Sequence, residues 1–330
     1  MDPTRPESFN HRSERLSTGR TYHFVDQIPT NYIPGSTPTL LCLHGFPDLW
    51  YGWRYQIGPW TRKGYRTVVP DMLGYGQTDM PFDATQYSTK MLCNDLVALL
   101  DLLGVSKAIV VGHDWGSYTA GRFALWHPDR LLALVMMSVP YTPPSLNYMP
   151  VEGVVSRYQD FGYQAYFATH SSTADIDPKV SYLLQILYRK SDGVMPWTKP
   201  GEMKNLLINE REVTDCLLNH KELEYYVSQF SRGVLGPLSY YRTAKVRYEE
   251  EKAASLPVNL RADLPVLFIW GNNDRTCPPA NVRKSRRFIP KVQDVVVEGT
   301  GHWIMVEASE TVTQQVLRWL DGLATQRSNL

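Results

Sequence analysis

Short apolar runs alternate with segments of helical period along most of the chain. The runs at residues 39–43, 66–69 and 108–111 have the length of buried strands. A segment that begins after Ser88 carries leucines on one face and stops at Gly104, as a capped amphipathic helix would. This alternation predicts a mostly parallel sheet flanked by helices.

The alternation stops after Pro140. From residue 141 to residue 260 the chain has few strand-like runs, many tyrosines and several helical stretches. Strand-like runs resume at residues 264–270 and 294–297, and a last amphipathic helix follows from about Ala308. The sequence therefore predicts one α/β core that is interrupted by a helical insert.

This pattern divides the chain into three parts. We expect residues 21–140 and 261–330 to form the α/β core and residues 141–260 to form a helical cap, or lid. Residues 1–20 are polar and lack the apolar segment of a secretory signal, so we expect them to be a flexible leader.

Charge and composition exclude several classes of protein. Lys and Arg total 34 against 33 Asp and Glu, which gives a net charge of +1 and no long-range field for nucleic acid or an anionic membrane. No apolar run approaches the ~20 residues of a membrane span. The 4 cysteines stand far apart without metal-ligand spacing, and no phosphate-binding glycine pattern is present, so we expect no metal and no cofactor.

These features favour a cytoplasmic protein with free thiols. The C-terminal Ser328-Asn329-Leu330 resembles a peroxisomal import signal but lacks its basic middle residue, which makes peroxisomal import a minor alternative. We expect a small molecule as the partner, and a homodimer stays open.

The main chemical signal is Gly112-His113-Asp114-Trp115-Gly116, directly after a strand-like run. A nucleophile elbow turns so sharply from strand to helix that small residues must flank the nucleophile two positions away on each side. Glycine stands at both positions, and the helix end beside the middle residue favours an anion. A five-residue pattern of this kind also arises by chance, with Asp114 as an ordinary helix cap. The sequence nevertheless favours Asp114 as a carboxylate nucleophile.

Two further residues follow predicted strands. Asp274 lies directly after residues 264–270, and His302 lies shortly after residues 294–297. The order nucleophile, acid, histidine is that of the α/β-hydrolase fold, and open α/β sheets place their sites at the carboxyl ends of the strands. His302 alone would be interpreted as a structural histidine. Together the three residues predict an α/β-hydrolase fold in which Asp274 orients His302 as the general base.

The turn that begins at His44 follows the first buried strand of the predicted core. Its position suggests that the Phe46 N–H and the Trp115 N–H form an oxyanion hole. We expect His44, Pro47 and Trp50 to line an apolar substrate pocket, although an aromatic residue here could equally belong to the core.

A carboxylate nucleophile narrows the reaction. Attack on an acyl group would form an anhydride, whereas attack on an electrophilic sp³ carbon forms an ordinary ester. Water activated by His302 can cleave that ester while the oxyanion hole holds the charge on the former Asp114 carbonyl. Epoxides and carbon–halogen bonds are the natural substrates of such a site.

The chain resembles the soluble epoxide hydrolases of the α/β-hydrolase superfamily, in particular the plant and fungal ones. The resemblance extends from about Tyr22 to Leu323. It rests on residues 44–54 (HGFPDLWYGWR), 71–76 (DMLGYG), 112–116 (GHDWG), 163–167 (YQAYF), 223–230 (LEYYVSQF) and 236–242 (GPLSYYR). It implies that an epoxide is converted to a vicinal diol through an ester on Asp114.

The resemblance also implies two tyrosine donors in the cap. In the family, two cap tyrosines hydrogen-bond the epoxide oxygen, and the matching positions here are Tyr163 and Tyr241. Tyr166 and Tyr240 are the alternative assignments, because each stands in the same motif.

Three other functions could use the same scaffold. Haloalkane dehalogenases usually carry Asn where Phe46 stands, and fluoroacetate dehalogenases carry Arg where Trp115 stands, so a dehalogenase is the second choice. A ligand receptor without catalysis has no need for an intact set of Asp114, Asp274 and His302. A cyclase that opens an epoxide with an internal hydroxyl would keep the same residues and stays open.

Overall fold

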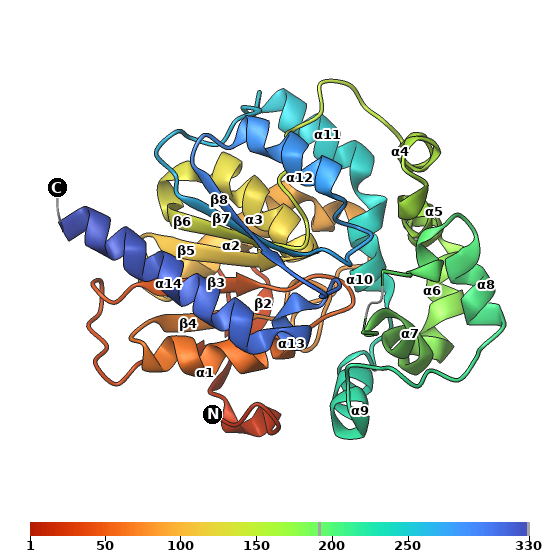
Figure 1. Cartoon of the computed structure of the whole chain (residues 1–330), viewed down its shortest axis with the longest axis horizontal. Helices are drawn as coiled ribbons and strands as arrows, with labels where there is room; N and C mark the ends of the chain where they lie inside the picture. Colours follow the sequence, from red (N-terminus) through yellow and green to blue (C-terminus); the bar gives the residue numbers. More distant parts are fainter. Residues whose placement is uncertain (191–192, 329–330) are drawn as a thin grey trace.

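An eight-stranded sheet forms the centre of the protein in the computed structural model, which describes residues 1–190 and 193–328 (Figure 1). The strand order is β1-β2-β4-β3-β5-β6-β7-β8. β2 pairs antiparallel with β1 and with β4, and all other neighbouring strands are parallel. This mostly parallel sheet with helices around it confirms the predicted fold class.

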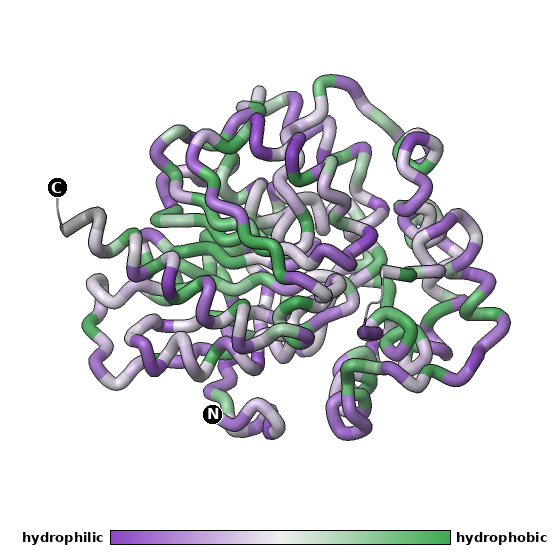
Figure 2. Tube along the Cα trace, viewed as in Figure 1, coloured by the Kyte–Doolittle hydropathy of each residue, from purple (hydrophilic) through white to green (hydrophobic). Residues whose placement is uncertain are grey.

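The strands are short and mostly buried. Their bounds are β1 His11–Arg15, β2 Thr21–Gln27, β3 Thr39–Leu43, β4 Arg66–Pro70, β5 Ala108–His113, β6 Leu131–Met137, β7 Val266–Gly271 and β8 Val292–Val297. β3, β4, β5 and β7 are buried at every residue because helices cover both faces of a parallel sheet. The hydrophobic centre of the sheet is visible in Figure 2.

Helices on the two faces of the sheet complete the core. Their bounds are α1 Arg54–Arg62, α2 Thr89–Leu102, α3 Trp115–Trp126, α11 Ala244–Ala253, α12 Pro279–Ser285, α13 Ile304–Glu307 and α14 Ser309–Ser328. α2 begins where the sequence predicted, because the Ser88 hydroxyl accepts a hydrogen bond from the Met91 N–H. The chain turns at Gly104, which has a positive φ of 67°.

Helices also make up most of the chain between β6 and β7. They are α4 Val151–Arg157, α5 Gly162–Ala168, α6 Ser171–Ile176, α7 Val180–Leu187, α8 Glu202–Ile208, α9 His220–Gln229 and α10 Leu235–Ser239, followed by α11. In Figure 1, α4 to α9 lie together beside the sheet, whereas α11 lies near α12 and α3. α11 is tied to the core because its Glu251 forms an ion pair with Arg122 of α3.

Buried polar contacts join this helical segment to the core. The hydroxyls of Tyr188 and Tyr226 both donate to Oδ1 of Asp48, each at 2.7 Å. Arg54 of α1 forms a buried ion pair with Glu222 of α9 at 2.9 Å. These contacts tie the helical segment to the part of the core that follows β3.

The expectation of a flexible leader at residues 1–20 is wrong for residues 11–15. These residues form β1, which pairs with β2 at the edge of the sheet. The strand consists of polar residues with alternating exposure, so it carries no apolar period from which a strand could be predicted. Arg12 also reaches Asp26 of β2 with a 2.9 Å ion pair.

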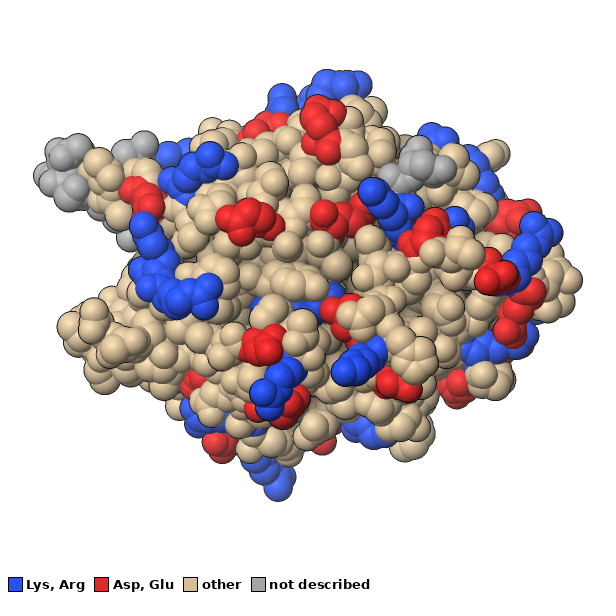
Figure 3. Space-filling model, turned by 60° about the horizontal axis from the view of Figure 1, so that its bottom comes forward, with Lys and Arg blue, Asp and Glu red and all other residues tan. Residues whose placement is uncertain are grey.

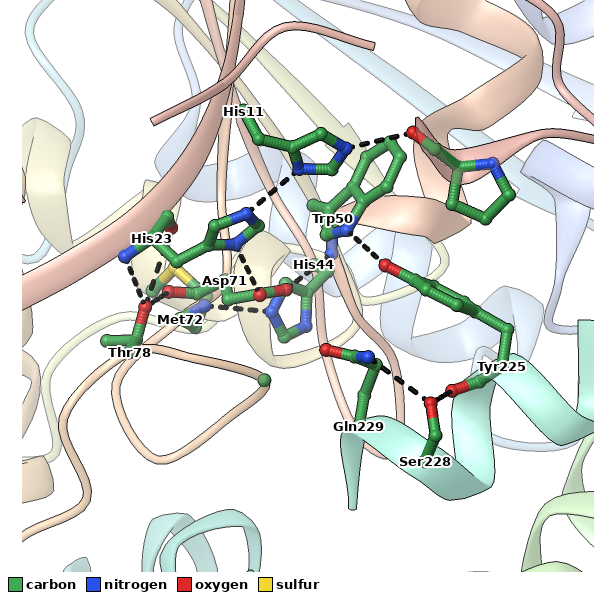
Figure 4. Close-up of polar contacts among 12 residues, drawn as sticks. His11, His23, His44, Trp50, Asp71, Met72, Thr78, Tyr225, Ser228 and Gln229 are labelled. Carbon is green, nitrogen blue, oxygen red and sulfur yellow. Dashed lines mark hydrogen bonds and ion pairs between the residues drawn. The ribbon is translucent and has the colours of Figure 1, made fainter. Parts of the chain in front are cut away.

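A chain of imidazoles fastens this edge strand to the core (Figure 4). His11 Nε2 contacts the Pro6 carbonyl at 2.9 Å, His11 Nδ1 contacts His23 Nε2 at 2.9 Å, and His23 Nδ1 contacts Asp71 at 2.7 Å. Burial raises the pKa of Asp71, but the hydrogen bond and charge of His23 outweigh it and leave the pKa lowered, so Asp71 is an acceptor. The Pro6 carbonyl, too, can act only as a hydrogen-bond acceptor. The three contacts therefore need three N–H groups on two rings, one more than two neutral imidazoles carry.

Charged side chains of both signs are interspersed over the face shown in Figure 3. This distribution agrees with the near-zero net charge of +1. None of the helices in the described part of the chain combines the length and the apolar character that a membrane span requires.

Candidate active site

Asp114 lies at the sharp turn between β5 and α3. Its backbone has φ 53° and ψ −120°, a conformation that a residue with a side chain rarely adopts. The turn is possible only with glycine on both sides. A Cβ atom on Gly112 would collide with the Gly116 carbonyl, and one on Gly116 would collide with the Leu43 carbonyl. The tight turn lifts the Asp114 carboxylate above the carboxyl end of the sheet.

Asp274 and His302 meet beside this carboxylate. His302 Nδ1 lies 2.8 Å from Oδ2 of Asp274, and His302 Nε2 lies 3.6 Å from Oδ2 of Asp114. Because a carboxylate accepts, Nδ1 carries its hydrogen toward Asp274 and Nε2 faces Asp114. The structure thus brings the three predicted residues together, although they are 160 and 28 positions apart in the chain.

The Phe46 N–H donates to Oδ1 of Asp114 at 2.8 Å. Trp115 begins α3, so its N–H belongs to the first turn, where a helix leaves its donors unpaired. Burial raises the pKa of Asp114, but the contact with His302 and its charge, with the Phe46 N–H, outweigh burial and leave the pKa below its ordinary value. Asp114 is therefore ionised at neutral pH.

His302 is positioned both through its imidazole ring and through its backbone carbonyl. Burial lowers its pKa, but the charge of Asp274 and the close contact with Asp114 outweigh burial and raise the pKa above its ordinary value. The His302 carbonyl accepts hydrogen bonds from His113 Nε2 at 2.9 Å and from the Ser138 hydroxyl at 2.8 Å. Burial, together with the charge of His302, lowers the pKa of His113 to about 4, so His113 stays neutral. Sequence reasoning gave neither His113 nor Ser138 this positioning role.

Tyr163 of α5 and Tyr241 line the same space as Asp114. Their ring centroids are 6.2 Å apart, and both residues border two cavities that Asp114 also borders. Burial, with the nearby charge of Asp114, raises the pKa of both phenols. Both are therefore neutral O–H donors at neutral pH.

The alternative tyrosines use their hydroxyls elsewhere. Tyr166 donates to Asp175 at 3.1 Å, and Tyr240 donates to the Leu73 carbonyl at 2.9 Å. Each is therefore engaged in holding the structure. This contrast favours Tyr163 and Tyr241 as the donors that face a substrate.

Two cavities meet at Asp114. The smaller, of about 20 Å³, lies on the His302 side and is lined by Phe46, Asp114, Tyr163, Phe167, Leu187, Trp197, Tyr241, Thr276, His302 and Trp303. The larger, of about 550 Å³, extends from Asp114 and Trp115 between residues 139–164 and helices α11 and α12. A space of this size suits a small organic ligand.

The prediction that His44, Pro47 and Trp50 line the substrate pocket is wrong. All three are buried, and within the described chain none of them borders the two cavities at Asp114. His44 Nε2 accepts from the Met72 N–H at 2.9 Å, and the Trp50 indole donates to Tyr225 at 3.0 Å (Figure 4). These side chains hold loops of the core in place, which the sequence could not distinguish from lining a pocket.

Thr276 is a further site residue that the sequence did not reveal. Its hydroxyl donates to Oδ1 of Asp274 at 2.7 Å and lies 3.2 Å from His302 Nδ1. Thr276 also borders both cavities. Its place two residues after Asp274 was the only available signal. Among the described residues, no group of His, Cys, Asp and Glu is suited to hold a metal.

Comparison with known proteins gives consistent results. Residues 38–309 match the α/β hydrolase fold family. The chain is 32% identical to epoxide hydrolase 3 of Siraitia grosvenorii over 295 residues, which is 86% of this chain and 91% of that protein. It is 30% identical to bifunctional epoxide hydrolase 2 of Rattus norvegicus over 324 residues. That match covers 96% of this chain but 56% of the rat protein, so the chain spans about half the length of this relative.

Solved structures are also similar. The crystal structure of an epoxide hydrolase from Vigna radiata superimposes with a TM-score of 0.82 at 29% identity, over 96% of this chain and 99% of that chain.

Proposed function

The chain belongs to the α/β-hydrolase family and, within it, to the epoxide hydrolases, and we propose on this basis that it converts an epoxide to a vicinal diol. The observation that carries the proposal is the carboxylate of Asp114 at a nucleophile elbow, within reach of His302. A serine at this position would favour acyl transfer, whereas a carboxylate favours attack on an sp³ carbon.

Ring opening is the first step of the proposed mechanism. An oxygen of Asp114 attacks one epoxide carbon, a C–O bond of the ring breaks, and the other carbon keeps the former epoxide oxygen as a developing alkoxide. The hydroxyls of Tyr163 and Tyr241 hydrogen-bond this oxygen and supply its proton. Neutral phenols suit this role because the raised pKa of each keeps the proton in place until the alkoxide forms.

Ester hydrolysis is the second step. His302 takes a proton from water, the hydroxide attacks the carbonyl carbon of Asp114, and the N–H groups of Phe46 and Trp115 hold the oxyanion. The C–O bond between the Asp114 carbonyl and the product oxygen then breaks. The proton on His302 passes to that oxygen, which releases the diol. The Asp114 carboxylic acid that remains returns its proton to the phenolate left by ring opening, which restores the carboxylate and the phenol.

The charge on Asp114 couples the two steps. In the free enzyme the Asp114 carboxylate helps to raise the pKa of His302. Esterification removes this negative charge and leaves Asp274 as the nearby anion. The pKa of His302 then falls toward neutrality, where a base is most effective.

A single turnover in ¹⁸O-labelled water tests the proposal. With enzyme in excess, the first diol should be almost unlabelled and the label should appear in Asp114, because the attacking oxygen comes from the carboxylate. Direct attack by water that His302 activates would label the diol in the first turnover. A labelled first-turnover diol would overturn the covalent mechanism and leave the fold assignment intact.

We also propose that residues 141–260 act as a cap over the site and that the protein works in the cytoplasm. Buried contacts between this segment and the core support the first proposal. The free thiols of Cys42, Cys93, Cys216 and Cys277 support the second. Asn329 and Leu330, part of the C-terminal segment compared with a peroxisomal signal, lie outside the described residues.

A further inference from the structure

Trp303, the residue directly after His302, contacts two histidines of the site. Its ring meets the His302 imidazole edge-on, with centroids 5.2 Å apart and planes at 88°. The same ring lies 5.3 Å from that of His113, which donates to the His302 carbonyl. Trp303 is buried and borders the smaller cavity. The orientation of the His302 ring therefore depends on where the Trp303 ring lies.

The end of α7 holds the Trp303 ring in place. The indole Nε1–H donates to the Leu187 carbonyl at 2.7 Å, and the Tyr188 ring stacks on the indole with centroids 3.8 Å apart and planes at 13°. Leu187 is the last residue of α7, where a helix leaves its carbonyls without partners inside the helix. This helix end therefore offers Trp303 both a hydrogen-bond acceptor and a flat aromatic surface.

Tyr188 is fixed through both its hydroxyl and its backbone. The hydroxyl donates to Asp48 at 2.7 Å, and the Tyr188 carbonyl accepts from the Leu217 N–H at 2.7 Å. The side chain is fully buried, and burial together with the charge of Asp48 raises the pKa of the phenol, which therefore stays a neutral donor. A continuous set of buried contacts thus runs from Asp48, in the loop after β3, through Tyr188 and Trp303 to His302.

The loop that carries His302 has few constraints of its own. Residues 298–303 connect β8 to α13 without a helix or strand, and Gly299 and Gly301 give this backbone more freedom than other residues would. His302 Nε2 lies 3.6 Å from Asp114, so a small shift of the ring changes the reach of the base. A displacement of ~1 Å in a reacting group can lower a rate about 10²-fold. The contact with Trp303 therefore bears on catalysis.

We propose that Tyr188 is a positioning residue for ester hydrolysis, because its stack on Trp303 sets the orientation of the His302 ring. The contact between the helical segment and the core then controls the second step of the reaction. Tyr188 borders neither of the two cavities of the site within the described chain, so it acts through Trp303 and not on the substrate. Ring opening does not use His302 as a base and should not depend on this contact. The inference rests on the proposed epoxide hydrolase function and adds a residue to it.

Single-turnover kinetics of Tyr188→Leu tests the inference. With enzyme in excess over a styrene-type epoxide, stopped-flow fluorescence gives the rate constant of alkylation, and rapid quench with mass spectrometry of the Asp114 peptide gives that of ester hydrolysis. Leucine removes the flat ring, so ester hydrolysis should slow by about 10- to 100-fold, as a displaced base would give. Alkylation should keep the wild-type rate constant. Both rate constants refer to folded enzyme only, so a loss of stability does not change them.

The pH dependence of ester hydrolysis adds a signature that a structural role alone would not give. Asp274 is the nearby anion that raises the pKa of His302 once Asp114 is esterified. A ring that is displaced from Asp274 loses part of this effect, so the pKa of His302 falls. The rise of the hydrolysis rate with pH should therefore begin at lower pH in Tyr188→Leu than in the wild type.

Two variants serve as controls. Tyr188→Phe keeps the ring on Trp303 and removes only the hydrogen bond to Asp48, so its ester hydrolysis should stay near the wild-type rate. Tyr226→Leu removes another fully buried tyrosine that donates to the same oxygen of Asp48 at 2.7 Å. In the described part of the chain, the Tyr226 ring packs on Tyr188 and has no ring contact with Trp303. Tyr226→Leu should therefore destabilise the protein and leave the rate constant of ester hydrolysis close to that of the wild type.

The outcomes separate this inference from the proposed function. Ester hydrolysis at the wild-type rate in Tyr188→Leu, an equal slowing of both steps, or an equal effect of Tyr226→Leu would overturn the positioning role while the diol product upheld the function. If Tyr188→Leu does not fold, Trp303→Phe keeps a ring but loses the donor to Leu187, and it should slow ester hydrolysis selectively. Unchanged hydrolysis in that variant would also overturn the role. A wild type that forms no ester on Asp114 would overturn this inference, and one that also forms no diol would overturn the proposed function as well.

Discussion

Removing the hydroxyls of Tyr163 and Tyr241 should slow ring opening without unfolding the protein. Phenylalanine keeps each ring in its packing, Tyr163 against Phe167 and Trp197, and Tyr241 against Trp115. Loss of one donor to a developing oxyanion costs ~10²–10³ in rate, or about 3–4 kcal/mol of transition-state stabilisation. Since two hydroxyls share the charge, each single variant should fall near the lower end of this range. The double variant should be nearly inactive because no donor is left.

Two other tyrosines provide matched controls. Tyr166→Phe removes a hydrogen bond to Asp175, and Tyr240→Phe removes one to the Leu73 carbonyl. Each control should lose about 1 kcal/mol of folding stability and keep the wild-type rate of ring opening. The variants of Tyr163 and Tyr241 should show the opposite pattern.

The measurement must isolate the first step. Stopped-flow tryptophan fluorescence with enzyme in excess follows alkylation of Asp114, whereas steady-state kcat could report ester hydrolysis. Because burial raises the pKa of both phenols, wild-type alkylation should stay constant up to at least pH ~10, the ordinary pKa of tyrosine. A double variant that opens styrene-type epoxides at the wild-type rate, or a control that loses the activity instead, would refute the assignment.

Three further outcomes are expected. Asp274→Asn should form the ester and then stall, because an amide no longer supports His302 as a base. Mass spectrometry should find the adduct on the peptide that contains Asp114, and an unmodified peptide would contradict the role of Asp274 in the second step. Alkylation should persist as pH falls through the ordinary carboxyl range, because the pKa of Asp114 is lowered. The rate of ester hydrolysis should instead rise with pH as His302 loses its proton. Rapid-mixing kinetics at several pH values measures the two steps separately, and the same pH dependence for both steps would contradict this expectation. Glu222→Gln should destabilise the protein by roughly 3–5 kcal/mol, because it leaves Arg54 buried without a counter-charge; urea unfolding measures this, and a change under about 1 kcal/mol would count against it.

The fold class and the three central residues were accessible from the sequence because their signals are local. Gly112 and Gly116 are required by a turn whose geometry involves only adjacent residues and one neighbouring strand. Asp274 and His302 each follow a strand, and parallel strands bring their carboxyl ends to the same edge of the sheet. Sequence order and periodicity were therefore enough to predict that these residues lie close together.

Other features depended on contacts between distant segments. Tyr163 and Tyr166 are three residues apart on one short helix, and only the way that α5 packs decides which hydroxyl borders the cavity and which reaches Asp175. Trp50 is an aromatic residue of the type that often lines pockets, but its indole is buried and donates a hydrogen bond to Tyr225.

The sequence by itself determined the elbow, the order of Asp114, Asp274 and His302 along the chain, and the type of bond that a carboxylate can attack. These follow from backbone geometry and the chemistry of single residues. Only the tertiary structure decided which charges are compensated. Arg54 and Arg122 form ion pairs with acids that are 168 and 129 positions away, whereas Arg247 lines the larger cavity and its Nε has no hydrogen-bond partner among the described residues. The composition of a nearly neutral chain cannot reveal this difference, because pairing depends on distances that only the folded chain sets.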